Sequence, residues 1–247
     1  ENFATTDVQP GTYHLQAKSG NNVYRDLGDY TFVAGRTTFV GLSPAYLPSV
    51  QLNNYGWNAS IIARNNSART AQINTNFLSQ AGSSNAQKTN WIPPRGSQIT
   101  QYPGGCYYCN RSAQAFASED AAVVVQTVYS GSAYQDGSAA TAYTGAAAGS
   151  TTMYLPFAVY APASGQYSAF SAQNTSGSPA NITMSYINRD GTQDFTIPDS
   201  IPVFGQQFYD LGVSGPKIPV WTNSGFYNTH GAWTGAVIVT SDQPITA

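Results

Sequence analysis

The sequence predicts an all-β protein made of two tandem antiparallel β-sandwich modules, immunoglobulin-like or jelly-roll-like in kind, preceded by an N-terminal strand or hairpin segment. Three observations support this fold class. Short extended stretches separated by turn residues recur about every 8 to 12 residues, as they do in β-sandwiches. No stretch has the 3.6-residue apolar period of an amphipathic helix, not even the Ala-rich residues 139–148. One long stretch also occurs twice, which divides the 247 residues into modules.

The repeat is found by aligning residues 56–102 with residues 165–211, at an offset of 109 and without a gap. Of the 47 aligned positions 11 are identical, where chance would give about three. A Tyr-Leu-Pro phrase at 46–48 returns at 154–156, and an apolar run at 122–125 returns at 236–239. We therefore expect an N-terminal segment at 1–45, a first module at 46–147 and a second module at 148–247.

The N-terminal segment is predicted to form strands. Residues 11–18 alternate apolar and polar side chains, which is typical of a half-buried strand, and a turn at 19–22 separates them from extended pieces at 23–27 and 29–33. The following phrase at 34–39 is echoed at 148–153, at the start of the second module. Residues 1–45 therefore resemble the closing part of a module.

Strands within the modules are predicted from the turns between them. In the first module they are expected at 61–64, 71–78, 87–92, 98–102, 121–129 and 138–143, and in the second at 167–173, 182–187, 193–197, 206–211 and 235–240. Residues 121–129 are the most apolar and are predicted to lie at the centre of a sheet. The Asp-Gly pair within 188–191 predicts a tight hairpin turn.

The composition indicates an exported protein. Charged residues make up 9% of the chain, against about 25% in an average soluble protein, while 41% apolar residues argue against disorder. The ten Lys and Arg residues are scattered and the net charge is −2, so we expect no nucleic-acid partner. No apolar run is long enough to predict a membrane span. There is no recognisable signal peptide, so Glu1 is expected to be a processed or chosen start. An extracellular location at the cell surface is expected.

The two cysteines, Cys106 and Cys109, are predicted to form a disulfide within a glycine-rich loop. A zinc site would need further ligands, and a redox role would need a helix N-terminus beside the pair, so these alternatives are weaker. Sequons at five asparagines permit glycosylation, although several would arise by chance in so polar a chain: Asn58, Asn65, Asn110, Asn174 and Asn181.

The sequence predicts no catalytic residues, no cofactor and no metal site. The only histidines, His14 and His230, are far apart, and the acidic residues gather at turns, where backbone hydrogen bonding favours Asp; calcium binding there is a weaker alternative. Carbohydrate binding is the main rival function, because aromatic rings can stack on sugars: Trp57, Trp91, Trp221 and Trp233. Trp57 and Trp91 have Gln166 and Ser200 as counterparts, however, so packing is the simpler interpretation.

Three phrases of the sequence resemble a known class of repeat. The stretches at 149–156, 172–176 and 235–245 are similar to the tandem β-sandwich repeats of large secreted surface proteins of the Chloroflexota type. The resemblance covers roughly residues 46–247 and is weaker in the first module. It implies surface architecture and no catalytic residues. Such repeats are usually followed by a further strand and a Tyr-containing extended segment.

The apolar strand expected at 235–240 is followed in this sequence by only 241–247, without a counterpart of 138–143. A sandwich that lacks a strand leaves unpaired backbone groups and invites another strand. We therefore expect residues 1–45 of one subunit to complete the second module of the next, which would give a head-to-tail homopolymer, as in an extracellular filament or cell-surface layer. The residues expected at this contact are Tyr13, Leu15, Tyr30, Phe32, Val237, Val239 and Ile245.

Two alternatives to the polymer remain open at this stage. The chain could be a piece of a longer repeat array, or residues 1–45 could fold back on their own first module. The alternative function is that of a surface adhesin or carbohydrate-binding module, with glycans as partners.

Overall fold

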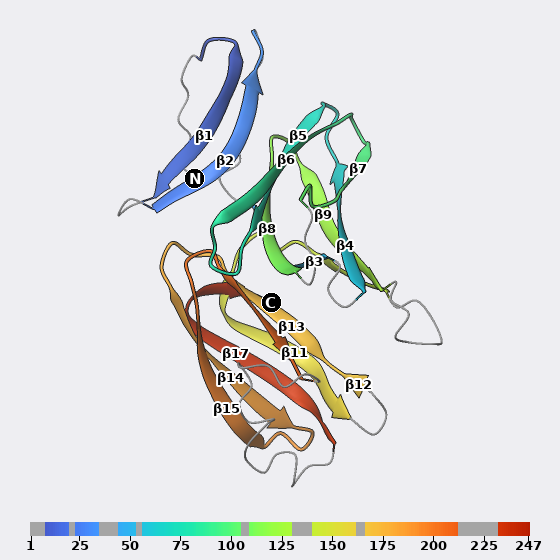
Figure 1. Ribbon diagram of the computed structural model, residues 1–247, viewed down its shortest axis with the longest axis vertical. Helices are drawn as coiled ribbons and strands as arrows, with labels where there is room; N and C mark the ends of the chain where they lie inside the picture. Colours follow the sequence, from blue (N-terminus) through green and yellow to red (C-terminus); the bar gives the residue numbers. More distant parts are fainter. Residues whose placement is uncertain are drawn as a thin grey trace.

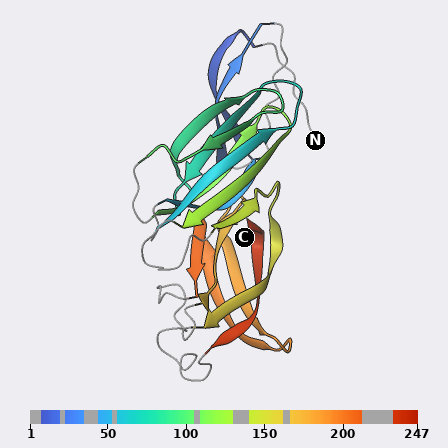
Figure 2. The ribbon, with the colours of Figure 1, turned by 90° about the vertical axis from the view of Figure 1, so that its right-hand side faces the viewer.

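In the computed structural model the first and second modules follow one another along the long axis, and an N-terminal hairpin lies beside the first module (Figures 1 and 2). The structure describes residues 8–19, 23–34, 44–52, 56–104, 109–129, 140–161, 166–211 and 232–247. These ranges contain seventeen strands and no helix. The predicted all-β fold class is therefore confirmed.

The N-terminal hairpin is a two-stranded sheet formed by β1 (Gly11–Ser19) and β2 (Val23–Phe32). The strands pair antiparallel from Gly11↔Phe32 to Ser19↔Val23, with a bulge between Leu15 and Gln16. Among the described strands, none pairs with β1 or β2 other than these two with each other. The hairpin is therefore a separate layer and not a strand of either sandwich.

The first module is a sandwich of two four-stranded sheets, ordered β3-β8-β5-β6 and β10-β9-β4-β7 (Figure 1). Leu47, Ile73 and Phe77 of one sheet meet Ile61 and Val125 of the other in an apolar core. The apolar strand predicted at 121–129 is β9, and it lies inside its sheet as expected. The strands are β3 (Ala45–Leu52), β4 (Trp57–Asn65), β5 (Ala71–Leu78), β6 (Ser84–Ile92), β7 (Ser97–Thr100), β8 (Cys109–Ala117), β9 (Ala121–Tyr129) and β10 (Ala140–Thr144).

The second module follows the same plan with fewer described strands. Shifted by 109 residues, β6 coincides with β15, and β4 coincides with β12 and β13 together. The long strand β17 pairs with β11, β14 and β13. The strands are β11 (Ser150–Ala161), β12 (Gln166–Tyr167), β13 (Ala169–Asn174), β14 (Ala180–Asn188), β15 (Gln193–Ile201), β16 (Gln206–Asp210) and β17 (Trp233–Thr246).

The first part of β17 corresponds to β8, and the alignment of residues 236–239 with 122–125 of β9 is wrong. Thr75 of β5 pairs with Ala115 of β8. The counterpart of Thr75, 109 residues later, is Met184, which pairs with Val239 of β17. Val239 therefore takes the place of Ala115, a shift of 239 − 115 = 124. The sequence misled because β8 is made of small and polar residues, whereas β17 and β9 are both apolar.

The end of β17 takes the first places of β9. Asn65 of β4 pairs with Ala121 of β9, and its counterpart Asn174 pairs with Ile245, again a shift of 124. Thr246 follows as the counterpart of the second residue of β9. In the described residues, no strand of the second module takes the places of the rest of β9 or of β10. Among its described residues, the second module therefore lacks counterparts of most of two strands, where the sequence predicted that one would be missing.

A buried asparagine closes the same turn in both modules. Asn65 is fully buried, and its side-chain nitrogen donates to the carbonyls of Ile92 and Pro93, both at 3.1 Å. Asn174, also fully buried, donates to the carbonyls of Ile201 and Pro202 at 3.3 and 3.1 Å. Each nitrogen also donates to a carbonyl four residues along the chain. This shared clamp explains several of the identities between the repeats.

The carbonyls that the clamp holds begin a second repeated turn. Gly96 N donates to Pro93 O at 3.0 Å, and Gly205 N donates to Pro202 O at 2.8 Å. The residues before these glycines, Arg95 and Phe204, have φ values of 59° and 54°, although side chains other than Gly rarely adopt this region. The two modules therefore retain the same strained backbone with different side chains.

Burial corrects three of the predicted glycosylation sites, two of which are the clamps. A glycan is attached to the asparagine side-chain nitrogen, which is covered and hydrogen-bonded in Asn65 and Asn174. Asn110 is also buried, with its nitrogen 3.4 Å from Ser171 Oγ. Asn58 and Asn181 are exposed, so glycosylation at these two positions stays a prediction.

We expect Asn174→Ala to lower the free energy of unfolding by about 3 kcal/mol, because it leaves buried carbonyl groups without their donor. Denaturant-induced unfolding followed by tyrosine and tryptophan fluorescence measures this change. The control is Asn66→Ala, in the equivalent turn of the first module, which should change stability by about 0.5 kcal/mol at most. Equal effects of the two substitutions would contradict the clamp.

Candidate assembly surfaces

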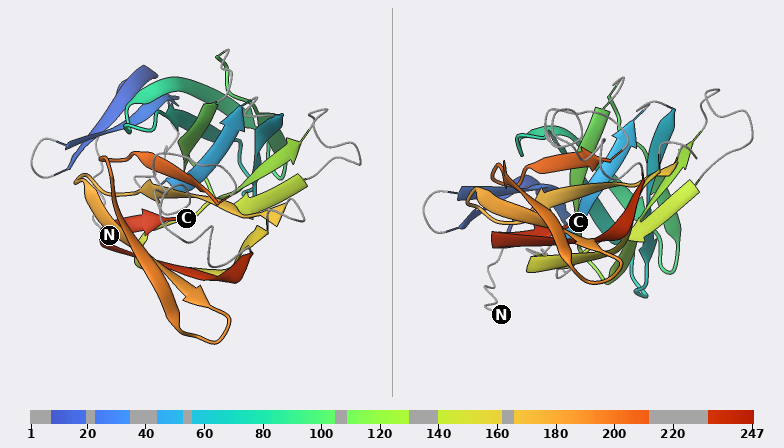
Figure 3. Two further views of the ribbon diagram at one scale, coloured as in Figure 1. Left: turned by 60° about the horizontal axis from the view of Figure 1, so that its bottom comes forward. Right: turned by 90° about the horizontal axis from the view of Figure 1, so that it is seen from below.

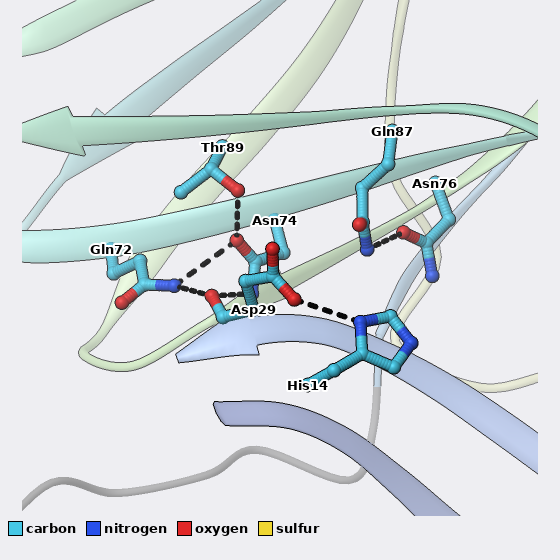
Figure 4. Close-up of polar contacts among 7 residues, drawn as sticks. All are labelled: His14, Asp29, Gln72, Asn74, Asn76, Gln87 and Thr89. Atoms are coloured by element: carbon cyan, nitrogen blue, oxygen red, sulfur yellow. Dashed lines mark hydrogen bonds and ion pairs between the residues drawn. The ribbon is translucent and has the colours of Figure 1, made fainter. Parts of the chain in front are cut away.

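The N-terminal hairpin docks on the outer face of β5 in its own chain (Figure 4). The Gln72 side-chain nitrogen donates to Asp29 O, and Asn74 Nδ2 donates to the same carbonyl at 3.1 Å. Thr31 N donates to Gln72 Oε1 at 3.4 Å. Gln72 and Asn74 are buried, and a buried amide without partners would be costly, so these bonds fix where β2 lies.

Polar side chains continue along this face of the first module. Thr89 Oγ1 donates to Asn74 Oδ1 at 2.9 Å, and Gln87 Nε2 donates to Asn76 Oδ1 at 2.8 Å (Figure 4). The counterpart of Asn74 in the second module is Thr183, which is half-buried and has no amide to offer. The docking face for the hairpin is therefore particular to the first module.

An apolar contact completes this docking. Tyr30 of β2 and Phe116 of β8 are fully buried against each other, and Leu15 and Phe32 pack around them. Burial raises the pKa of Tyr30 to about 12, which the Asn74 side chain partly offsets. The hairpin thus forms a third layer over the sheet of β5 and β8, and this corresponds to the alternative in which residues 1–45 fold back on their own module.

The structure divides the residues predicted to make subunit contacts. Tyr30, Leu15 and Phe32 face the chain's own first module, while Tyr13 is partly exposed and packs edge-on against Phe32 at 5.8 Å. On the other predicted side, three residues lie in the second module's core at 0% exposure: Val237, Val239 and Ile245. That part of the prediction is wrong, because these side chains point inward between the sheets and cannot touch another molecule.

Backbone groups join the two modules. Gln206 N of the second module donates to Gln80 O of the first at 3.0 Å. The Tyr46 hydroxyl donates to Thr175 O at 3.3 Å, in a buried position. Asn110 Nδ2 adds a bond to the Ser171 hydroxyl. The turn between β5 and β6 therefore sits against the turn between β15 and β16.

Two glycines allow this close approach. A Cβ atom on Gly82 would lie 1.9 Å from Val203 O, and one on Gly205 would lie 2.5 Å from Gln80 O. Gly191 is the counterpart of Gly82 in the second module, with nearly the same φ, +86° against +84°, yet nothing lies within 4 Å of an added Cβ. The turn between β14 and β15 is thus an unoccupied copy of the turn that joins the modules, and it projects from the second module in Figure 3.

The Tyr-Leu-Pro phrase shows the same contrast. Tyr46 is 4% exposed at the junction, whereas Tyr154 is 71% exposed. Pro48 is buried and Pro156 is exposed. Three residues along from Tyr154, Phe157 is 67% exposed. The second module therefore presents aromatic surface that the first module covers.

One edge of the second module is also less paired than its counterpart. β4 pairs with β9 from Trp57 to Asn65, but β13 pairs with β17 only at Gln173 and Asn174. In the described residues, Ala169 and the next three residues of β13 have a partner strand on the β16 side alone. An edge of this kind can accept another strand.

Tyr143 in β10 indicates how such a strand is received in the first module. Its hydroxyl donates to Ser49 O at 2.7 Å and accepts from Ser49 N at 3.0 Å, at the bulge of β3. Burial raises the pKa of Tyr143 above its ordinary value. The matching bulge of β11 lies between Leu155 and Ala158 and includes the exposed Phe157.

The cysteines, the tryptophans and His230 were also considered as site residues in the sequence. Cys109 is disulfide-bonded, while Cys106 lies outside the described residues, as do Trp221 and His230. Trp57 packs against Tyr129 at 5.2 Å, and Trp233 is buried, so neither ring forms a sugar platform. In the described ranges, no three His, Cys, Asp or Glu side chains gather as metal ligands.

The search for relatives and for membrane segments was negative. No family model, curated protein or solved structure matches the chain. Within the part of the chain that the structure describes, no helix could cross a bilayer.

We expect Gly82→Ala to be more destabilising than Gly191→Ala, although both place a side chain at nearly the same φ. Each substitution should cost about 1 kcal/mol of backbone strain, and only Gly82→Ala also collides with Val203 O. Thermal unfolding of both variants measures the difference. Identical melting temperatures would contradict the tight junction.

Proposed function

We propose that this chain is a structural subunit of an extracellular filament or cell-surface layer, and that its copies join head to tail by strand donation. In this assembly the β1–β2 hairpin of one copy pairs with the β13 edge of the next. The observation that carries the proposal is the unequal pairing of β4 and β13, since β4 has β9 along its whole length.

The hairpin has the features of the strands that it would replace. Both β1–β2 and β9–β10 are antiparallel pairs. Their second strands both contain Tyr-Thr near the end, from Tyr30 in β2 and Tyr143 in β10, and the sequence Ala-Gly-x-Thr-Thr comes a few residues later in both, at 34–38 and 148–152. Tyr30 could therefore bond the bulge of β11 at Phe157 as Tyr143 bonds that of β3 at Ser49.

Donation requires the hairpin to leave its own module. The contacts to be given up are the bonds of Gln72 and Asn74 and the packing of Tyr30 on Phe116. The two-residue pairing of β12 with β11 would also open, because β12 holds the place of the first residues of β4. In exchange, the donated strand pairs with β13 and covers exposed aromatic surface.

The extracellular setting is supported by chemistry. Disulfides persist in oxidising surroundings, and Cys109 is disulfide-bonded. Charged residues make up only 9% of the chain, so Ser, Thr, Asn, Gln and Tyr cover much of the surface. A head-to-tail contact of this kind does not close on itself, which suits a fibre.

We expect Ala169→Pro to weaken assembly by about tenfold or more, because proline has no backbone N–H group to donate to an added strand. Asn174 N donates toward the β16 side, and direction alternates along a strand, so the Ser171 and Ala169 N–H groups point toward the open edge. Sedimentation velocity over a concentration series and electron microscopy measure assembly.

The matched control is Ala169→Thr, which keeps the N–H group and should assemble as the unaltered chain does. Deletion of residues 1–34 should also abolish fibres. Fibres that form equally well with proline at position 169, or an unaltered chain that stays monomeric at every concentration, would overturn strand donation.

A second candidate function is carbohydrate binding, favoured by Trp91, whose side chain is 51% exposed on β6. Exposed tryptophan rings stack on sugars. Glycan-array binding that is lost in Trp91→Ala would support this function, whereas binding that is unchanged would exclude this ring as the site.

A further inference from the structure

We propose that the outward-facing ends of the two modules are complementary docking surfaces. In this contact the β14–β15 turn of one copy docks on the β6–β7 turn of a second copy. This contact would repeat, between molecules, the junction that joins the two modules within one molecule. It extends the proposed head-to-tail assembly but does not involve the hairpin or the β13 edge.

The outward end of the second module has the backbone of the turn that already makes a junction. Ser79 N donates to Ser83 O at 2.9 Å, and Asn188 N donates to Thr192 O at 2.8 Å. Within each turn the glycine N donates back to the first residue, at 2.9 Å in both. The free turn of β14 and β15 is therefore preformed for the same contact.

The outward end of the first module has the backbone of the surface that receives this turn. Asn66 N donates to Asp120 O at 2.9 Å, as Thr175 N donates to Pro244 O at 3.0 Å. The turns at Gly96 and Gly205 close with the same bond. The Asn66 carbonyl thus takes the place of the Thr175 carbonyl, which accepts the Tyr46 hydroxyl at the internal junction.

Residues at the internal junction are more buried than their counterparts at the outward-facing ends of the modules. Gly205 is buried at the junction and Gly96 is half-buried, while its neighbours Pro94 and Arg95 are exposed. Tyr154, the counterpart of Tyr46, is 71% exposed. Large exposed aromatic side chains often mark an interface, and here the chain contains the surface that fits them.

Opposite charges on the two turns favour docking of the second copy in this orientation. In the internal junction the two facing turns contain Ala81 and Phe204, which are uncharged. Their counterparts at the free ends are Asp190 and Arg95, which are opposite in charge and exposed, although the exposed Arg189 lies directly beside Asp190 in the sequence. Hydrogen bonds from Thr192 hold the pKa of Asp190 below its ordinary value, so its carboxylate is charged at neutral pH. Opposite charges across a joint steer association and fix its direction.

A charge exchange tests this docking. We expect Asp190→Arg alone and Arg95→Asp alone each to weaken self-association by about tenfold, because like charges then face each other. An equimolar mixture of the two variants should recover association, since each end again meets its opposite. Sedimentation velocity measures all three samples, and raised salt should weaken association of the unaltered chain.

A steric variant covers the possibility that the charges contribute little. Gly191→Asn retains a residue that tolerates positive φ but adds a side chain where a second copy would approach. It should melt near the unaltered chain and associate at least about tenfold more weakly. Unchanged association of Gly191→Asn, or no recovery in the mixed sample, would overturn the docking.

The two assembly proposals fail separately. If Ala169→Pro blocks fibres while Gly191→Asn does not, strand donation stands and end docking is wrong. If Gly191→Asn blocks association while Ala169→Pro does not, the reverse holds. An unaltered chain that remains monomeric at every concentration overturns both.

Discussion

The requirement that sheet edges find backbone partners organises this molecule. In the first module β4 lies between β9 and β7, and it pairs with β9 along its whole length and with β7 from Ile61 to Arg64. In the second module, Ala169 and its neighbours in β13 have a described partner on the β16 side alone. The equivalent strands β4 and β13 therefore differ in how far a described strand pairs along their second edge.

The N-terminal hairpin is docked on the first module of its own chain. It is a preformed antiparallel pair, yet it rests on its own first module through two buried amides and one tyrosine. The bonds from Gln72 and Asn74 are specific to that face, because Thr183 replaces the second amide in the other module. The hairpin cannot stay on this face and at the same time pair with β13 of another copy, as the proposed donation would require.

The sequence predicted the fold class and the repeat because both depend on local patterns. The turn at 188–191 and the apolar strand at 121–129 were predicted from the local order of residue types. It did not predict β3, β8 or β11. β3 and β11 contain prolines, which are unusual inside strands, and β8 contains the polar residues Asn110, Ser112 and Gln114, which break the apolar pattern of a core strand although all three are buried. The buried clamps at Asn65 and Asn174 read only as sequons, since burial is a tertiary property.

The junction between the modules combines main-chain atoms with a few side chains. The carbonyls of Gln80, Thr175 and Val203 and the amide of Gln206 meet across it, with two glycines providing clearance. Such a joint demands particular residues at positions such as Tyr46, Asn110 and Ser171 and at the two glycines. Residues on the rest of each module's surface are therefore free to change without loosening the connection between the two modules of this chain.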